Sequence, residues 1–405
     1  MTRRAFPPPF RCGTFGAPRP EPPLALRGAC ILQITPRLDA GGVEAVTIET
    51  ARFIAEARGR ALVASAGGAL EPQLAAAGGR LLRVPVDRRF PFALEANADR
   101  LARLIRREEV DLIHVRSRAP AFPALAAAAM TDRPVVMSYH GVYAAGSPLK
   151  RWYNAVMTRG DAVIANSAFT AAHIQAEHRL DPAKLVVIPE GIDTARFDPS
   201  QVGPERLAAA RLAMGLAPDD TRQVLLLPAR LTGWKGQALA MAALAQVRCE
   251  AGVVLVLAGA PRGPADAEAL SRAAHAAGLA EQVLIPGPLA DMPAALAAAD
   301  LVLAPSTSPE SFGRIVAESC AMGAVTLASD LGGAAEIIVH GKTGLLLPPG
   351  DAAAWARGLE EAFALSPEAR SAIGAAARAR VVEQFDLAGM KTGTINLYRR
   401  LLGIS

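Results

Sequence analysis

Short apolar runs alternate with segments of helical periodicity along most of this chain. Apolar runs of strand length occur at 31–35, 61–65, 111–115, 135–139, 162–165 and 185–188. The segments between them, such as 44–58, 93–107 and 119–130, repeat apolar positions about every three to four residues, as amphipathic helices do. Strand, helix and strand in this order predict a parallel sheet that helices cover on both faces.

A second series of the same kind begins near Gln223. Its predicted strands are 224–227, 253–258, 283–285, 301–304, 325–328 and 344–347, and helical stretches at 351–365, 367–384 and 386–402 close the chain. We therefore predict an α/β protein with two Rossmann-like, doubly wound domains, 30–195 and 223–385, that face a cleft. Residues 196–222 are rich in proline, aspartate and arginine, which predicts a linker with one short helix.

Residues 1–29 form a segment of different composition. They hold seven prolines and five arginines without an amphipathic period, so we predict a disordered or extended segment. The segment lacks the apolar core of a signal peptide. Two interpretations stay open: a tether to a membrane surface, or a tail without function that could arise from a misassigned start codon.

The composition excludes several classes of protein. Hydrophobic residues make up 51% of the chain and charged residues 20%, which is unlike a disordered chain. No run approaches the roughly 18 to 20 apolar residues of a membrane-spanning helix. The four cysteines are scattered, and the histidines lack metal-ligand spacing. We therefore expect neither a disulfide scaffold nor a metal site, and we expect a cytoplasmic protein.

The net charge of +5 is unevenly distributed. Residues 1–200 carry 26 lysines and arginines against 19 acidic residues, or +7, whereas residues 201–405 carry 17 against 19, or −2. A basic half suits nucleic acid, anionic lipid or an anionic substrate. No nucleic-acid-reading module is recognisable, so nucleic acid is not an expected partner.

The helix predicted at 93–107 places Arg100, Arg103 and Arg107 on one face, which is either a solvated surface or a contact with anionic lipid.

Two glutamates flank a predicted helix start after the strand 301–304. Glu310 precedes Gly313, near which the helix begins, and Glu318 lies within that helix. Free backbone N–H groups at a helix start suit phosphate, and carboxylates on either side can accept hydrogen bonds from hydroxyls. The alternative is that Glu310 only caps the helix and Glu318 is only exposed on it.

Cations, glycines and a histidine follow other predicted strands. Arg230 and Lys235 could hold phosphate oxygens or be ordinary solvated charges. Gly41 and Gly42 permit close approach of an anion, or form a simple turn. His140 ends a strand and could bind a sugar hydroxyl, whereas His114 within a strand is expected to be a satisfied core residue. Further candidates for an anionic acceptor are Arg116, Arg118, Lys150, Arg151, Trp152 and Tyr153.

The segment 305–351, PSTSPESFGRIVAESCAMGAVTLASDLGGAAEIIVHGKTGLLLPPGD, resembles the retaining glycosyltransferases of family 4, often called group 1, which have the two-domain GT-B fold. The resemblance implies that 30–195 is the acceptor-side domain, that 223–385 binds the sugar donor, and that a helix at 386–405 crosses back to the first domain. The chain departs from the family pattern at Trp234, which replaces a smaller or polar residue, and at Glu190, where asparagine is usual.

The same resemblance implies roles for individual residues. Glu318 would bind the ribose of a nucleotide-diphosphate sugar, and Glu310 would contact the donor sugar. The catalytic set would be His140, Glu310, Arg230 and Lys235, and the donor-binding set would be Gly41, Gly42, Arg230, Lys235, Phe312, Gly313, Arg314, Ile315 and Glu318.

The expected chemistry needs neither a metal nor a further cofactor. No Asp-x-Asp triplet occurs in the sequence, and Arg230 and Lys235 can stabilise the departing diphosphate instead. The resemblance implies transfer with retention, to a glycan or lipid-linked acceptor in lipopolysaccharide or other cell-surface polysaccharide synthesis, at the inner face of the cytoplasmic membrane. One alternative is a non-catalytic protein that binds sugars and nucleotides. An NAD-dependent oxidoreductase is disfavoured because the glycine fingerprint is missing.

Overall fold

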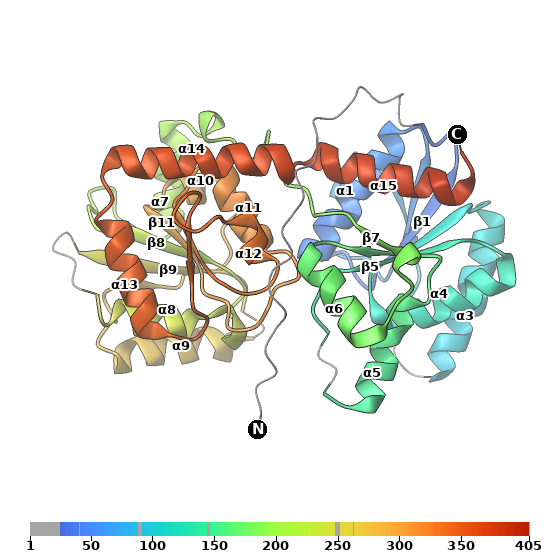
Figure 1. Ribbon diagram of the computed structural model, residues 1–405, viewed down its shortest axis with the longest axis horizontal. Helices are drawn as coiled ribbons and strands as arrows, with labels where there is room; N and C mark the ends of the chain where they lie inside the picture. The colour runs from blue at the N-terminus through green and yellow to red at the C-terminus, as the bar shows by residue number, and fades with distance from the viewer. Residues whose placement is uncertain are drawn as a thin grey trace. The chain divides into compact units, whose positions relative to one another are not determined.

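The computed structural model describes residues 25–39, 41–87, 91–143, 146–247, 252–261 and 263–404. Most of the predicted N-terminal segment, residues 1–24, therefore lies outside the described residues. The described residues divide into two compact units (Figure 1). The first comprises those up to Pro189 together with those from Ala388 onward, and the second is Glu190–Leu387.

The first unit is built on a parallel sheet with the strand order β3-β2-β1-β4-β5-β6-β7. Its strands are β1 (Cys30–Ile34), β2 (Arg60–Ser65), β3 (Gly79–Arg83), β4 (Leu112–Val115), β5 (Val135–Tyr139), β6 (Ala162–Ala165) and β7 (Leu185–Val187). Its helices are α1 (Gly42–Glu56), α2 (Glu71–Ala76), α3 (Pro91–Arg107), α4 (Arg118–Thr131), α5 (Pro148–Asn154), α6 (Ala168–His178) and α15 (Leu387–Leu402).

The two faces of this sheet differ in chemistry. Alternate residues of the central strands, such as Leu32, Ile113 and Met137, join side chains of α3 and α4 in one apolar core. Their neighbours in sequence point to the opposite face, because successive side chains of a strand alternate. At the carboxyl end this opposite face carries buried polar groups, which include Gln33 and His114.

The second unit is built on another parallel sheet, with the order β10-β9-β8-β11-β12-β13. Its strands are β8 (Gln223–Pro228), β9 (Val253–Ala258), β10 (Val283–Leu284), β11 (Leu301–Ala304), β12 (Thr326–Ser329) and β13 (Leu345–Leu347). Its helices are α7 (Pro204–Ala213), α8 (Gln237–Leu244), α9 (Pro264–Ala276), α10 (Met292–Ala297), α11 (Arg314–Ala321), α12 (Ala334–Ile337), α13 (Ala352–Phe363) and α14 (Pro367–Gln384). An apolar core lies on each face, so this is the predicted doubly wound arrangement.

Residues 196–222 do not behave as a linker. Phe197, Met214 and Leu216 are buried in one core of the second unit, and Arg206 on α7 binds Asp291 through two hydrogen bonds of 2.7 and 2.8 Å. The segment therefore packs onto the second unit through these buried residues, although Leu212 on α7 is exposed.

The chain passes between the units at two places that lie side by side. Ile192 forms a parallel bridge with Asp386, and its N–H donates to the carbonyl of Phe385 at 2.8 Å. The N–H of Leu387 donates in turn to the carbonyl of Ile192 at 3.2 Å. Beyond this bridge α15 packs on the first unit, where Lys391 pairs with Glu56 of α1 at 2.5 Å.

Candidate functional site

Three loops meet at the carboxyl edge of the second sheet, and the first two carry predicted donor-side residues. They follow β8, β11 and β12, and β11 is the neighbour of both other strands. The N–H of Thr307 donates to the carbonyl of Trp234 at 2.8 Å, and that of Gly333 donates to the backbone carbonyl of Glu310 at 2.8 Å. The backbone therefore holds the three loops together at the edge where open α/β sheets bind ligands.

Lys235 and Glu310 meet at the centre of these loops. Lys235 Nζ lies 2.8 Å from Glu310 Oε1, and the Ser306 hydroxyl donates to the same oxygen at 2.5 Å. Both charged side chains are only 13% exposed, and Nζ lies 4.4 Å from the ring centroid of Trp234. Such charge-assisted contacts in a partly buried place are stronger than an exposed ion pair. The cation and the carboxylate that the sequence predicted as separate ligand groups therefore form one unit.

Glu318 is paired with Arg314 one helical turn earlier on α11. Arg314 Nε donates to Glu318 Oε1 at 2.9 Å, and the side chains are 19% and 13% exposed. The family resemblance placed Arg314 in the donor-binding set. The structure adds that its side chain orients the carboxylate of Glu318.

Phe312 and Gly313 are constrained by packing. Phe312 is 2% exposed, and its ring lies 5.8 Å from that of Phe385. Gly313, the residue before α11, has φ +99°, and a Cβ there would lie 2.9 Å from Cα of Ala334 on α12. The glycine is thus required by the fold, whatever ligand approaches its backbone. Ile315 is half-buried in the first turn of α11.

Arg230 follows β8 and its side chain is exposed. Its carbonyl accepts a hydrogen bond of 3.0 Å from Nε2 of Gln237, at the start of α8. The loop backbone is therefore fixed while the guanidinium extends to the surface, which suits the predicted contact with a phosphate.

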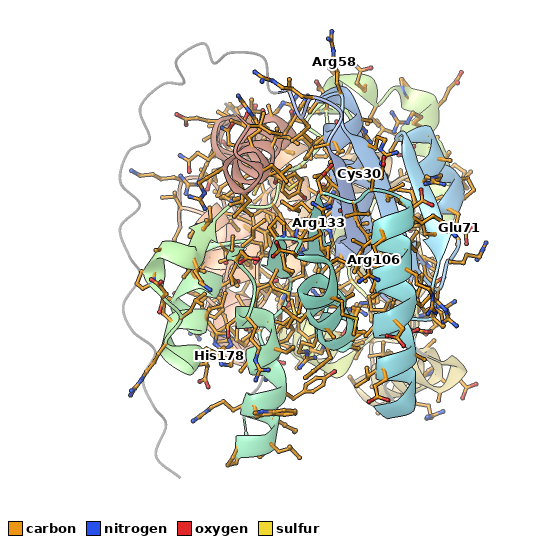
Figure 2. The ribbon with its side chains drawn as sticks, turned by 90° about the vertical axis from the view of Figure 1, so that its right-hand side faces the viewer. Cys30, Arg58, Glu71, Arg106, Arg133 and His178 are labelled. Atoms are coloured by element: carbon orange, nitrogen blue, oxygen red, sulfur yellow. The ribbon has the colours of Figure 1, made fainter. Side chains whose placement is uncertain are left out.

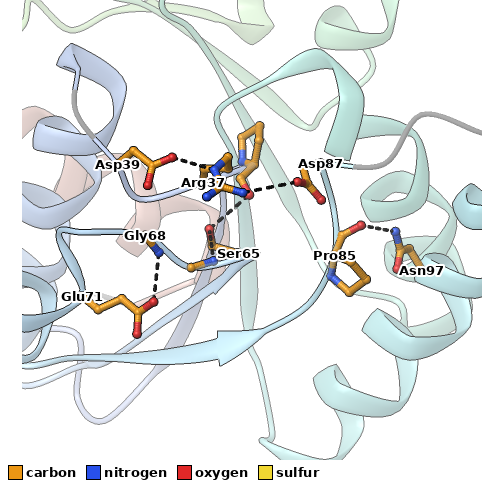
Figure 3. A network of polar contacts seen from close by, with 10 residues as sticks. Arg37, Asp39, Ser65, Gly68, Glu71, Pro85, Asp87 and Asn97 are labelled. Carbon is orange, nitrogen blue, oxygen red and sulfur yellow. Dashed lines mark hydrogen bonds and ion pairs between the residues drawn. The ribbon is translucent and has the colours of Figure 1, made fainter. Parts of the chain in front are cut away.

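The predicted Gly-Gly turn follows β1 at the carboxyl edge of the first sheet, and Figure 3 shows contacts of Arg37 and Asp39, which precede it. Arg37 after β1 bonds to Asp39 at 2.6 Å and lies 3.8 Å from Asp87, which follows β3. The hydrogen bond from Arg37 lowers the pKa of the exposed Asp39 carboxyl. These contacts fix the loop that leads to Gly41 and Gly42, which are both exposed at the start of α1.

His140, the predicted catalytic histidine, follows β5 and is half-buried. Arg116 Nη1 lies 3.2 Å from His140 Nε2, and the Arg116 side chain is almost fully buried, at 2% exposure. The expectation that Arg116 faces an acceptor is therefore wrong, because its guanidinium is turned inward. Arg118 is held too: its guanidinium lies 4.0 Å from the ring centroid of Tyr143 and donates to Asn154 at 2.7 Å.

His114 is the buried residue that the sequence predicted, and it has partners on both ring nitrogens. Nδ1 lies 2.5 Å from the hydroxyl of Tyr398, and Nε2 lies 2.6 Å from that of Ser138. The sequence did not indicate that Tyr398 and Gln33 belong to this group. The glutamine within the otherwise apolar run 31–35 was the sequence feature that could have indicated a buried polar group there.

The described residues contain no group of three or more histidine, cysteine, aspartate or glutamate side chains placed to hold a metal ion. Within the same part of the chain, no helix combines the length and the apolar character that crossing a membrane requires.

Comparison with known proteins identifies similar chains. Residues 40–196 match a family described as Glycosyltransferase Family 4, and residues 214–380 match one described as Glycosyl transferases group 1. A D-inositol 3-phosphate glycosyltransferase of Jonesia denitrificans is 32% identical over 253 residues, which are 60% of this chain. The match spans 58% of that protein, so this chain covers little more than half the length of the curated relative.

Two solved structures are similar over nearly the whole chain. A glycosyltransferase from Rickettsia africae ESF-5 has a TM-score of 0.85 and 29% identity, covering 94% of this chain and 100% of its own. Anabaena Alr3699/HepE in complex with UDP and glucose has a TM-score of 0.81 and 25% identity, covering 92% and 100%. The same Anabaena protein is also known in complex with UDP-glucose.

Proposed function

Since this chain belongs to the group 1 glycosyltransferases of family 4 and has their GT-B fold, we propose that it transfers a sugar from a nucleotide-diphosphate sugar to a glycan or lipid-linked acceptor. The observation that carries the proposal is the pairing of cations with carboxylates at the carboxyl edge of the second sheet, Lys235 with Glu310 and Arg314 with Glu318. This set offers cations for a diphosphate and carboxylates for sugar and ribose hydroxyls, in the loops after β8 and β11 and at the start of α11.

We take UDP-glucose as the first donor to test, because Alr3699/HepE binds it. In this proposal Glu318 accepts hydrogen bonds from the ribose and Glu310 from the sugar. Arg230 and Lys235 hold the diphosphate, and the backbone of 312–315 approaches the sugar and phosphates at the start of α11. The site needs no cofactor besides this co-substrate.

The proposed reaction is a metal-independent transfer with retention. The bond between the anomeric carbon and the β-phosphate oxygen breaks, and the same carbon forms a bond with the acceptor oxygen on the same face. The departing phosphate oxygen takes the proton of the acceptor hydroxyl, so no protein base is required. Lys235 and Arg230 stabilise the charge that develops on the diphosphate.

The proposed acceptor belongs to lipopolysaccharide or another cell-surface polysaccharide, and the enzyme would meet it at the inner face of the cytoplasmic membrane. Support comes from the exposed arginines of α3, of which Figure 2 labels Arg106, and from the exposed side chains of α5. On α5 the side chains of Leu149 and Trp152 are 74% and 55% exposed beside the exposed Lys150 and Arg151. Exposed apolar and basic groups together are typical of contact with anionic lipid.

A thermal-shift series over UDP-, GDP-, ADP- and CMP-sugars tests the donor class. We expect one diphosphate nucleotide sugar to raise the Tm, and Glu318→Ala and Arg230→Ala to remove that shift. Release of the nucleoside diphosphate from this sugar then separates an enzyme from a protein that only binds. A folded protein that no nucleotide sugar stabilises would contradict the proposal.

Vesicle sedimentation tests the membrane contact. We expect binding to vesicles with anionic phosphatidylglycerol, weakened by salt, and little binding to vesicles of phosphatidylcholine alone. Leu149→Ser with Trp152→Ser should reduce binding, with Met130→Ser as a control for an exposed apolar residue on another helix. Equal binding to both kinds of vesicle would contradict the contact.

A further inference from the structure

A buried polar network lies beneath His140 in the first unit. It occupies the sheet face opposite the main apolar core and joins β1, β4 and β5 to helices α1 and α15. Its members are almost completely buried: Gln33, Thr50, His114, Arg116, Ser138 and Tyr398. Polar groups at such depth need defined hydrogen-bond partners, so the proton positions can be derived from the contacts.

His114 fixes one end of the network. Burial holds its pKa well below the ordinary value, so the ring is neutral and carries one proton. Burial also raises the pKa of Tyr398, which therefore keeps its hydroxyl proton. Arg116 Nη2 lies 3.5 Å from Nδ1, and this positive charge disfavours a ring proton on that side, so Nδ1 accepts the hydrogen bond from the Tyr398 hydroxyl. The ring proton of His114 is then on Nε2 and is donated to Ser138.

Gln33 and Thr50 fix the guanidinium of Arg116. Gln33 donates through Nε2 to the carbonyl of Thr47 at 3.0 Å, so its Oε1 is free to accept from Arg116 Nε and Nη2, at 3.0 and 2.7 Å. Nη2 also donates to the Thr50 hydroxyl at 2.8 Å. Three contacts thus set the plane of the guanidinium and direct Nη1 toward His140.

The direction of the hydrogen bond between Arg116 and His140 then follows from their chemistry. A guanidinium has five N–H donors and no acceptor, so the 3.2 Å contact requires a lone pair on His140 Nε2. Only a neutral imidazole with its proton on Nδ1 offers that lone pair. We propose that His140 is held in this Nδ1–H tautomer, that it acts in the transfer reaction as a hydrogen-bond donor, and that Arg116 is the positioning residue.

The role of His140 as a hydrogen-bond donor in the transfer reaction rests on the proposed function, whereas its tautomer rests on the geometry alone. A neutral N–H donor can bind an oxygen of the sugar or phosphate but cannot take the acceptor's proton through Nε2, which is already occupied. The proton then has to leave with the departing phosphate, as the proposed retaining reaction requires. Arg116 acts on the reaction only through His140.

Ring ¹⁵N NMR of the full-length protein tests the tautomer without any substrate. With ¹⁵N-histidine labelling and His140→Gln to identify the signals, we expect His140 Nδ1 to have the shift of a protonated nitrogen and Nε2 that of an unprotonated one. Arg116→Met should move the population toward Nε2–H, and Arg116→Lys should partly restore the original pattern. Arg133→Met, an exposed arginine before β5, is the matched control and should leave the His140 signals unchanged.

The outcomes separate the two proposals. A proton on Nε2 of His140 in the unaltered protein overturns the inference, and this measurement stands even if Arg116→Met does not fold. The expected tautomer in a protein that transfers no sugar would count against the proposed function alone. With an active donor such as UDP-glucose, Arg116→Met should lower kcat about as much as His140→Ala; unchanged kcat would overturn the positioning role.

Discussion

Lys235 Nζ lies 2.8 Å from Oε1 of Glu310, so the cation proposed to hold the diphosphate is already paired with the carboxylate proposed to hold the sugar. A ligand that binds both groups has to replace this contact with contacts of its own. The pair keeps two largely buried charges compensated when no ligand is bound, since an unpaired charge at such a place is costly.

Replacing Lys235 with methionine should impair catalysis, and it should also lower the free energy of unfolding, because it leaves the Glu310 carboxylate without its cation. Loss of one cation at the departing diphosphate should lower kcat about 10²- to 10³-fold. Steady-state release of UDP from UDP-glucose measures the effect. Arg272→Met, which removes the exposed partner of Glu268 on α9, is the control and should change kcat less than about twofold. A Lys235→Met protein with unaltered kcat would exclude the proposed role.

Arg314 and Glu318 should act as one unit in nucleotide binding. We expect Glu318→Gln to weaken UDP binding about tenfold or more, and Arg314→Met to weaken it less, because Arg314 only orients the carboxylate. Titration calorimetry on both variants and the double variant gives a coupling energy, expected at about 1 kcal/mol for residues in contact. Strictly additive effects would show that the 2.9 Å contact does not matter for binding.

Gly313 should be intolerant of a side chain for reasons of folding alone. Gly313→Ala meets both the positive φ and the 2.9 Å approach to Ala334, so we expect a loss of about 1 to 3 kcal/mol in the free energy of unfolding. Gly203→Ala before α7 is the matched control: its φ is −79° and nothing lies within 4 Å of the added Cβ. Urea unfolding should place that variant within about 0.5 kcal/mol of the unaltered protein.

His114 should make the stability depend on pH. Burial depresses its pKa in the folded chain, so below about pH 6.5 the unfolded chain binds a proton that the folded chain does not. The free energy of unfolding should then fall as the pH falls, with a slope that approaches about 1.4 kcal/mol per pH unit.

The comparison of His114→Gln with the unaltered protein isolates this contribution. His173 and His178 also have pKa values lowered by burial, but they contribute equally to both proteins. Urea unfolding between about pH 7.5 and 5.5 should give a smaller slope for the variant. Identical slopes would show that His114 is protonated in the folded chain.

The alternation of strands and helices was predictable because buried parallel strands are continuous apolar runs. The strand β3 was not predicted, since it lies at a sheet edge and places the exposed Arg80 and Arg83 among its five residues. The packing of 196–222 was also missed, because single apolar residues such as Phe197 give no periodic signal.

The candidate site was predictable in its residues but not in its contacts. The resemblance of 305–351 to the group 1 family indicated Glu310 and Glu318, and the position of Arg230 and Lys235 after a predicted strand indicated these two cations. The pairing of Arg314 with Glu318 depends on side-chain direction, which the sequence leaves open. The contacts of Arg116 with Gln33, 83 residues away, depend on which strands become neighbours.

The contact between His114 and Tyr398 has a consequence for synthesis of the chain, because the two residues are 284 positions apart. Translation at about 5 to 20 residues per second would separate them by roughly 15 to 60 seconds. The unit that emerges first from the ribosome thus waits for its last helix until the whole of the other unit has been made. During that interval the sheet face that holds Gln33, His114 and Arg116 lacks the contact with α15.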